Sequence, residues 1–351
     1  MLSRQIISCI VSVFIVNNYV NAAELTLVTE TKIAAIPSLP SSNGVQKGQY
    51  EASGLTVDQE GVWYVVMDNS LRILTVKPVE GPEGWQWTNA SLSPVNGADD
   101  QSEYEAITYD NRKSLNFYTM EEMNRHKRAE VKKYNSALTP PPVNEPTSVV
   151  FSDRNKGFEG AEWIWHCYDQ DTNGDNYILG LCEGNNCTDS KSGTGVIQVL
   201  RKKTGTPTLW ELFTDQNSIL PNGEMKLPKS FRDYSGIALY PAYPKTCDCS
   251  DVCDGSGEYT IAITSQQDSK LWLGQLNTKN WSLSNGATYN FPQSEEKKYC
   301  NIEGVSILSL TKENDKVISA RFAIASDAYG GTDNACKATD QSLHIFDLSV
   351  E

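Results

Sequence analysis

Five short segments of the chain carry an oxygen-bearing side chain in the same local setting. Ser53, Glu105, Glu159, Ser235 and Glu303 are each followed by Gly or Ala and then by an apolar residue. Carboxylates and hydroxyls are the hard oxygen ligands that Ca²⁺ accepts in flexible geometry, whereas Zn²⁺ prefers nitrogen and sulfur. Three carboxylates packed together would repel one another unless a cation lay among them. Brought to one place, these five residues would therefore form a calcium site.

Tight packing is the alternative explanation of the same pattern. Gly and Ala allow strands to approach closely where space is crowded. This accounts for the small residues, but not for the Glu or Ser that precedes each of them, because apolar side chains would fill a dry channel at lower cost. The sequence therefore favours the metal site.

The elements that must position these residues are strands. After each segment come stretches rich in β-branched and aromatic residues with alternating polarity, as is typical of β-strands. This internal repeat predicts an all-β fold, a five-bladed β-propeller with four strands per blade. In such a ring the innermost strands line a central channel, and the residues that open them face the axis. A β-sandwich is the alternative on pattern alone.

The two ends of the chain complement each other in this scheme. The last repeat offers only three strands, at residues 304–308, 321–326 and 342–348, while residues 25–33 have strand composition and precede the first repeat. We expect this N-terminal strand to pair as the outer strand of the last blade and so close the ring.

The five segments also resemble the blade-opening motifs of a known family, the SdiA-regulated (YjiK-like) propellers. The order Ser, Glu, Glu, Ser, Glu is in addition similar to the central calcium ligands of the calcium-activated nucleotidase (apyrase) propellers, which implies the same ion at the five positions here. The resemblance spans nearly all of the mature chain. It is carried by Ala52-Ser53-Gly54-Leu55-Thr56, Tyr104-Glu105-Ala106-Ile107-Thr108-Tyr109, Gly157-Phe158-Glu159-Gly160-Ala161, Asp233-Tyr234-Ser235-Gly236-Ile237 and Ile302-Glu303-Gly304-Val305.

The loops between second and third strands should open on the face that holds the ion. They would make an acidic bowl from Asp68-Asn69, Glu121-Glu122, Glu183, Asp268 and Asp327. Two functions remain open for this face. In the first, calcium rigidifies the ring and the loops bind a small-molecule or protein ligand.

In the second, the protein is a calcium-dependent hydrolase. Calcium would polarise a phosphoryl or ester oxygen, while Asp68 or Asp327 orients water. A nucleotidase needs several Arg and Lys residues around the phosphates, and the loops offer few, so the nucleotidase activity is not carried over. Phytase-like or esterase-like chemistry rests on analogy alone.

The N-terminus predicts export. Arg4 precedes an apolar stretch at 6–16 and small residues at 21–23, so we expect residues 1–23 to be a signal peptide and 24–351 a single secreted domain. No later stretch is long and apolar enough for a membrane span. The sequons at Asn89, Asn186 and Asn280 suit a glycosylated surface. A formal net charge of -14 argues against nucleic acid as a partner.

Cysteine usage agrees with export. Cys9 lies in the signal peptide, which leaves an even number of cysteines that should form disulfides. Zinc is the alternative for Cys247, Cys249 and Cys253, although their spacing fits no standard pair of zinc hooks. Cys182 with Cys187, and Cys300 with Cys336, are candidate local pairs, and the full connectivity stays open.

Overall fold

A computed structural model of the protein describes residues 24–37, 39, 50–68, 70, 72–94, 104–110, 116–121, 128–139, 141–151, 157–166, 175–185, 195–203, 205, 208–214, 220, 222–227, 231–241 and 257–350. Nearly all of its regular structure is β-strand. The elements are β1 (Thr26–Lys32), η1 (Ile33–Ala35), β2 (Ala52–Val57), β3 (Trp63–Met67), β4 (Arg72–Gly81), β5 (Gly84–Pro94), β6 (Tyr104–Asp110), β7 (Asn116–Glu121), β8 (Arg128–Tyr134), β9 (Val143–Val150), β10 (Phe158–His166), β11 (Asp175–Asn185), β12 (Gly195–Lys203), β13 (Leu209–Leu212), β14 (Glu224–Lys226), β15 (Gly236–Tyr240), β16 (Glu258–Ser265), β17 (Lys270–Asn277), β18 (Ser282–Asn290), β19 (Ile302–Glu313), β20 (Lys316–Ser326), α1 (Asn334–Lys337) and β21 (Ser342–Ser349).

The strands form antiparallel sheets in which neighbours along the chain are neighbours in space. Three sheets have four strands, in the orders β2-β3-β4-β5, β15-β16-β17-β18 and β1-β21-β20-β19. A larger sheet follows the order β10-β11-β12-β13-β9-β8-β7-β6, with β14 paired to β12. Among the described residues, the strand pairing between its two halves runs through β13 and β9, at the parallel pair Trp210 and Thr147.

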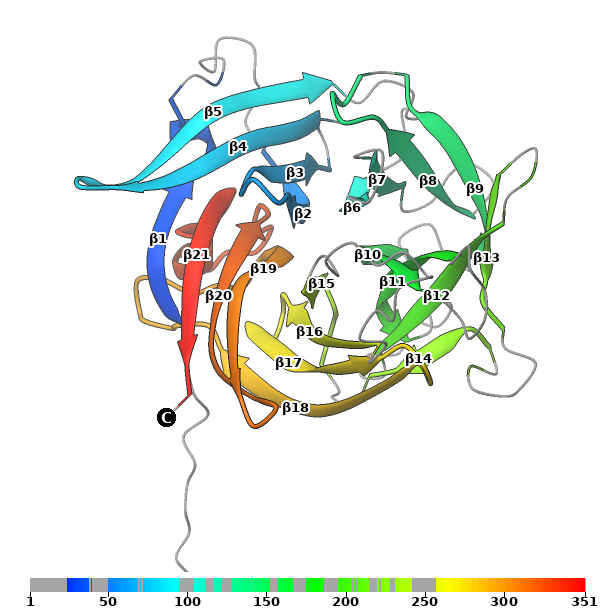
Figure 1. Cartoon of the computed structure of the whole chain (residues 1–351). Helices are drawn as coiled ribbons and strands as arrows, with labels where there is room; N and C mark the ends of the chain where they lie inside the picture. The colour runs from blue at the N-terminus through cyan, green and yellow to red at the C-terminus, as the bar shows by residue number, and fades with distance from the viewer. Residues whose placement is uncertain are drawn as a thin grey trace, which may run out of the picture.

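The sheets stand around a common axis (Figure 1). The strands nearest the axis touch one another in a closed cycle, from β2 to β6, β10, β15, β19 and back to β2. This is the arrangement of a β-propeller and not that of a sandwich, in which two sheets pack face to face.

The first and last strands of the described chain lie side by side in the sheet β1-β21-β20-β19. β1 pairs antiparallel with β21, in a register that runs from Thr26 opposite Asp347 to Lys32 opposite Ser342. The expected pairing of the N-terminal segment with the last strands is thus confirmed. It joins residues from the two ends of the chain in one sheet.

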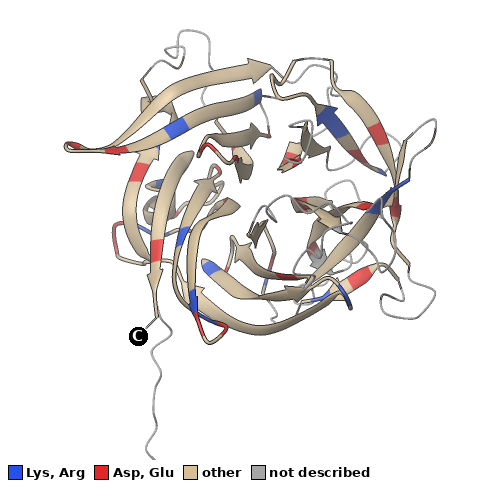
Figure 2. Cartoon of the chain, viewed as in Figure 1, with Lys and Arg blue, Asp and Glu red and all other residues tan. Residues whose placement is uncertain are grey.

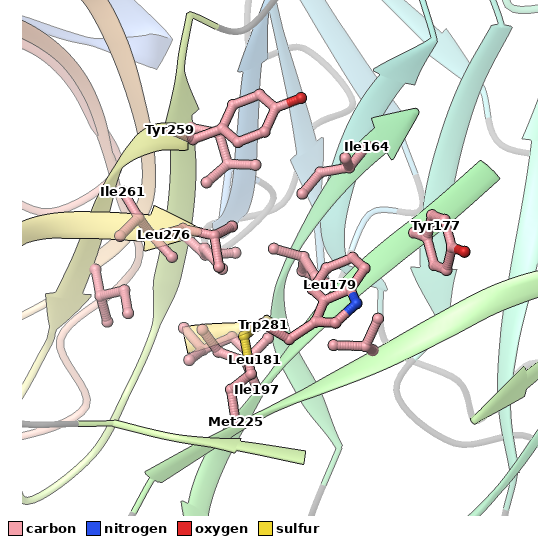
Figure 3. Close-up of a cluster of buried hydrophobic side chains, with 14 of the residues drawn as sticks. Ile164, Tyr177, Leu179, Leu181, Ile197, Met225, Tyr259, Ile261, Leu276 and Trp281 are labelled. Atoms are coloured by element: carbon pink, nitrogen blue, oxygen red, sulfur yellow. The ribbon is translucent and has the colours of Figure 1, made fainter. Parts of the chain in front are cut away.

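The hydrophobic core lies between neighbouring sheets. The cluster in Figure 3 packs Leu179 and Ile197 of one sheet against Ile261 and Leu276 of the next, with Trp281 inserted between them. The tryptophans Trp63 and Trp210 are buried, at 1% and 0% exposure. Burial of such large side chains between sheets stabilises the ring.

Glycines allow the inner strands to approach closely. A Cβ at Gly236 would lie 2.4 Å from the carbonyl oxygen of Glu303, and one at Gly304 would lie 2.7 Å from the Cβ of Leu55. Tight packing, the alternative explanation of the repeat, is therefore correct for these glycines.

The predicted disulfide between Cys300 and Cys336 is confirmed. Cys182 is also disulfide-bonded, and its partner lies outside the described residues. The predictions for residues 1–23 and for Asn186, Cys187, Cys247, Cys249 and Cys253 fall outside them too. Asn89 and Asn280 are exposed. No helix among the described residues is long and apolar enough to cross a membrane.

Candidate functional site

The five predicted ligand residues lie where the innermost strands begin. Ser53, Glu105, Glu159 and Glu303 are each the second residue of their strand, and Ser235 directly precedes β15. These strands surround the axis (Figure 1). The residues that directly follow the five positions, Gly54, Ala106, Gly160, Gly236 and Gly304, line one small cavity.

Four of these residues share a local backbone feature that the sequence analysis did not predict. The pairing register shifts between Ala52 and Gly54, and equivalent shifts bracket Glu105, Glu159 and Glu303. Each of the four is therefore the extra residue of a β-bulge. A bulge leaves one residue outside the ladder and re-aims its side chain, and such bulges are frequent next to functional sites. Ser235 differs, because its N–H donates to Thr264 O at 3.1 Å.

The three glutamates keep contact with solvent in an otherwise buried setting. Glu105 is the only residue of β6 that is not buried, and Glu303 lies between the buried Ile302 and Gly304. Ser53 and Ser235 are buried, at 4% and 2% exposure. A small cavity of about 10 Å³ lies on the axis, lined by Glu159 and Glu303 among small and aliphatic residues. Its size is close to the room needed for one water molecule.

Negative charge accumulates around Glu303. Burial raises the pKa of Glu303 well above its ordinary value, and the carboxylates of Asp327, Glu105, Asp233 and Glu183 raise it further. Gln266 Nε2 donates a hydrogen bond to Glu303 Oε1. Figure 2 shows that acidic residues occur next to the axis as well as on the rim.

The side chains do not form a closed metal-binding cluster as they stand. Within the part of the chain that the structure describes, no three His, Cys, Asp or Glu side chains group closely enough to hold a metal ion. The structure thus places the five positions at the starts of the innermost strands but does not gather Glu105, Glu159 and Glu303 into a cluster.

The two candidate catalytic residues occupy equivalent positions in two sheets. Asp68 follows β3 and donates its N–H to Glu51 O at 2.8 Å, and Asp327 follows β20 and donates its N–H to Asn301 O at 2.9 Å. Burial raises the pKa of the Asp327 carboxyl to about 7, and the carboxylates of Glu51 and Asp340 contribute to this shift.

Two other residues assigned to the acidic bowl have structural partners that the sequence analysis missed. Glu121 is buried and forms an ion pair of 3.0 Å with Lys132. Asp268 accepts a hydrogen bond of 2.7 Å from Arg232 Nε. Glu183 lies close enough to Glu303 to raise its pKa, whereas Asn69 and Glu122 lie outside the described residues.

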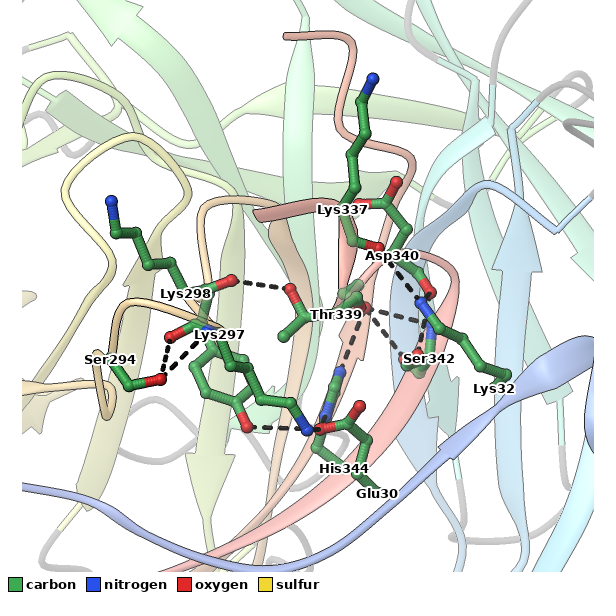
Figure 4. Close-up of polar contacts among 12 residues, drawn as sticks. Glu30, Lys32, Ser294, Lys297, Lys298, Lys337, Thr339, Asp340, Ser342 and His344 are labelled. Atoms are coloured by element: carbon green, nitrogen blue, oxygen red, sulfur yellow. Dashed lines mark hydrogen bonds and ion pairs between the residues drawn. The ribbon is translucent and has the colours of Figure 1, made fainter. Parts of the chain in front are cut away.

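Ser326, His344 and Glu30 also meet near the closure of the ring. Figure 4 labels His344 and Glu30. Ser326 Oγ lies 3.1 Å from His344 Nε2, and His344 Nδ1 lies 3.7 Å from Glu30 Oε2. Ser326 and His344 are fully buried, however, and Ser326 Oγ also bonds to the carbonyls of Thr339 and Ser342. A nucleophile must be reached by its substrate, so this group is structural.

Comparisons with known proteins add no family assignment. No protein-family model matches the sequence, and no curated protein matches it. Among solved structures the chain is similar to a GH43_1 enzyme from Xanthomonas citri complexed with xylotriose, at 9% identity, 94% coverage of this chain, 91% of that chain and a TM-score of 0.43. An endo-arabinase from Bacteroides thetaiotaomicron gives 13% identity, 88% and 95% coverage and a TM-score of 0.38. The Dos1 propeller gives 9% identity, 85% and 62% coverage and a TM-score of 0.33. Likenesses this distant say nothing about activity.

Proposed function

We propose that the protein is a secreted five-bladed β-propeller of the SdiA-regulated type that binds Ca²⁺ on its axis and a small-molecule or protein ligand on the loop face above the ion. The ion would be held by the oxygen atoms of Ser53, Glu105, Glu159, Ser235 and Glu303. The blades would be β2–β5, β6–β9, β10–β13, β15–β18 and β19–β21 with β1. In this scheme the single pair between β13 and β9 is a contact between two neighbouring blades.

The observation that carries the calcium proposal is the repeated bulge. A bulge at one strand start could arise from local packing, but four of them place a Ser or Glu outside the ladder at the same step of the repeat. The oxygen-only chemistry of the residue set suits Ca²⁺, which accepts carboxylates and hydroxyls together. Repulsion between the carboxylates around Glu303 also favours a cation there.

When bound, calcium would neutralise these carboxylates and link the starts of the inner strands. The chain itself determines the direction of the ligand side chains and the spacing of the inner strands. The bulges aim the side chains, and the glycines beside them let the strands approach. Because the strands form a closed cycle, one ion would stabilise the whole ring.

The test is a calorimetric titration of the purified protein with CaCl₂. We expect binding by the unaltered protein and strongly weakened binding by Glu303→Gln and by Glu159→Gln. The matched control is Glu313→Gln, since Glu313 is an exposed glutamate at the far end of the same strand as Glu303. Equal Ca²⁺ affinity of the unaltered protein and all three variants would contradict the proposed site.

A calcium-dependent hydrolase is the second candidate, and one observation favours it. The pKa of Asp327 near 7 gives a carboxyl that can accept a proton from water at neutral pH. A screen against nucleotides, phytate and simple esters, with calcium and with chelator, decides between the two functions. Chelator-sensitive turnover that Asp327→Asn abolishes would establish the hydrolase, and inactivity on every substrate would favour the binding protein.

A further inference from the structure

We propose that Gln266 is a positioning residue of the axial site, whose amide restrains the Glu303 carboxylate near the start of β19, where it would bind the cation. This role rests on the proposed calcium site. The sequence carries no signal for this role, because Gln266 belongs to none of the five repeated segments.

The contact crosses from one sheet to the next. Gln266 lies in the turn that joins β16 to β17, and Glu303 lies near the start of β19. The Gln266 amide nitrogen donates to Glu303 Oε1 across 37 positions of sequence. Both side chains are partly exposed. A residue outside the ligand set thus reaches the carboxylate directly.

The turn that carries Gln266 is firmly anchored. Ser265 Oγ donates to Asp233 Oδ1 at 2.5 Å, and the Gln267 N–H donates to Asp233 Oδ2 at 2.9 Å. On its other side, the Arg232 N–H donates to Asp268 Oδ2 at 2.8 Å. Since the residues flanking Gln266 are fixed on both sides, its amide approaches Glu303 from a defined direction.

The chemistry of an amide suits this position. A carboxylate has two oxygens with about four lone-pair sites. One amide donor on Glu303 Oε1 can therefore fix the orientation of the carboxylate while other sites remain for a cation. A lysine could do the same, but it would add a positive charge that competes with the cation. The neutral amide orients the Glu303 carboxylate without neutralising its negative charge, which remains available to the cation.

Partners of this kind matter in metal sites. Removing a group that hydrogen-bonds to a metal ligand typically lowers metal affinity about 10- to 100-fold. We expect a loss of this size for Gln266→Ala and for Gln266→Met, which keeps the length of the side chain but removes the donor. The control is Gln267→Ala, because Gln267 is exposed and bonds to Asp233 through its backbone.

The experiment combines calcium calorimetry, thermal melting of the calcium-free protein and Tb³⁺ luminescence. The proposal predicts weaker Ca²⁺ binding by both Gln266 variants, unchanged binding by Gln267→Ala, and unchanged calcium-free melting temperatures. Lifetimes of bound Tb³⁺ in H₂O and D₂O should reveal an additional bound water in the Gln266 variants, as expected if Glu303 no longer holds its place.

Unchanged affinity in both Gln266 variants would overturn the role of Gln266 while leaving the calcium site intact. So would weaker binding that is matched by a lower calcium-free melting temperature, because this would indicate a merely structural contact. If the unaltered protein binds no Ca²⁺, the axial site itself fails and this role with it.

Discussion

Lys297 Nζ donates a hydrogen bond of 2.8 Å to Glu30 Oε2, although the two residues are 267 positions apart in the sequence. Glu30 lies on β1, and Lys297 lies in the segment before β19. Tyr299 OH donates to the same oxygen at 3.3 Å, and the buried His344 of β21 lies 3.7 Å from it. The strand that closes the ring is therefore held by a polar group as well as by its backbone ladder (Figure 4).

Replacing Glu30 with Gln should weaken this closure in a pH-dependent way. Burial raises the pKa of Glu30, but the hydrogen bonds and charges of His344 and Lys297 outweigh it and lower the pKa to about 2. Because the pKa of Glu30 is lower in the folded state than the ordinary value of 4.5, its ionised carboxylate stabilises the folded state at pH values above 4.5. This contribution is lost as the pH falls toward 2.

We expect Glu30→Gln to lower the free energy of unfolding by about 2–3 kcal/mol at pH 7, with the difference vanishing toward pH 2. Urea denaturation across this pH range measures it, and the exposed Glu295→Gln serves as control. A loss that does not depend on pH would contradict the electrostatic origin.

Glu162 should show the opposite dependence on pH. Burial raises its pKa to about 7, although Thr108 Oγ1 and the Leu239 N–H donate hydrogen bonds to it at 2.9 and 3.2 Å. A carboxyl with a raised pKa does not destabilise the folded state at pH values below 4.5, where it is protonated in both states. Its full destabilising effect is reached at pH values above about 7. Glu162→Gln keeps an acceptor oxygen but removes the charge.

The stability of Glu162→Gln relative to the unaltered protein should therefore rise between pH 4 and pH 8. Because Glu162 keeps some exposure to solvent, we expect a change of about 1–3 kcal/mol. Paired denaturation curves at the two pH values test this, and an equal difference at both would show that Glu162 does not titrate as described.

Calcium removal should lower the melting temperature if the axial site is correct. A ligand that binds only the folded state contributes about 2.7 kcal/mol at a concentration of 100 times its dissociation constant. Differential scanning calorimetry with CaCl₂ and with chelator measures this shift, which should be absent in Glu159→Gln. An equal response of the variant to chelator would place the responsible ion elsewhere.

The repeat could be found from the sequence because each inner strand carries its own signal. Glu303-Gly304-Val305 matches Glu159-Gly160-Ala161 in residue type and in place within the repeat. The bulges could not be found in this way, because a register shift is a property of two paired strands. The same holds for Gln266 and Glu303, whose contact depends on how neighbouring sheets pack.

Buried ion pairs between strands were missed for the same reason. Glu121 was assigned to the acidic bowl from its place after a predicted strand, but Lys132, which faces it from β8, is itself 2% exposed. Sequence alone gives no reason for a lysine to be buried there. The short strand β14, whose partner is β12, is also not predicted from the sequence.

The disulfide between Cys300 and Cys336 should stabilise the segment before β19. The two cysteines are 36 positions apart, and a loop of this length gives about 4 kcal/mol by loss of unfolded-chain entropy. We expect the double variant Cys300→Ser, Cys336→Ser to lose stability of this order in chemical denaturation. If reducing agent destabilises the double variant as much as the unaltered protein, this bond is not the source of the effect.

Gly236 lies against the backbone of Glu303, so a larger residue at this position tests how closely the inner strands pack. A Cβ added at Gly236 would lie 2.4 Å from the carbonyl oxygen of Glu303 and 2.7 Å from Thr264 Oγ1. Because backbone cannot yield as a flexible side chain does, β15 and β19 would have to separate. Overpacking of this kind typically costs about 1–3 kcal/mol. Gly330→Ala is the matched control, since nothing lies within 4 Å of its added Cβ. The melting temperature should fall clearly for Gly236→Ala and hardly at all for Gly330→Ala. Equal melting temperatures of the two variants would show that β15 and β19 can accommodate a methyl group at this position.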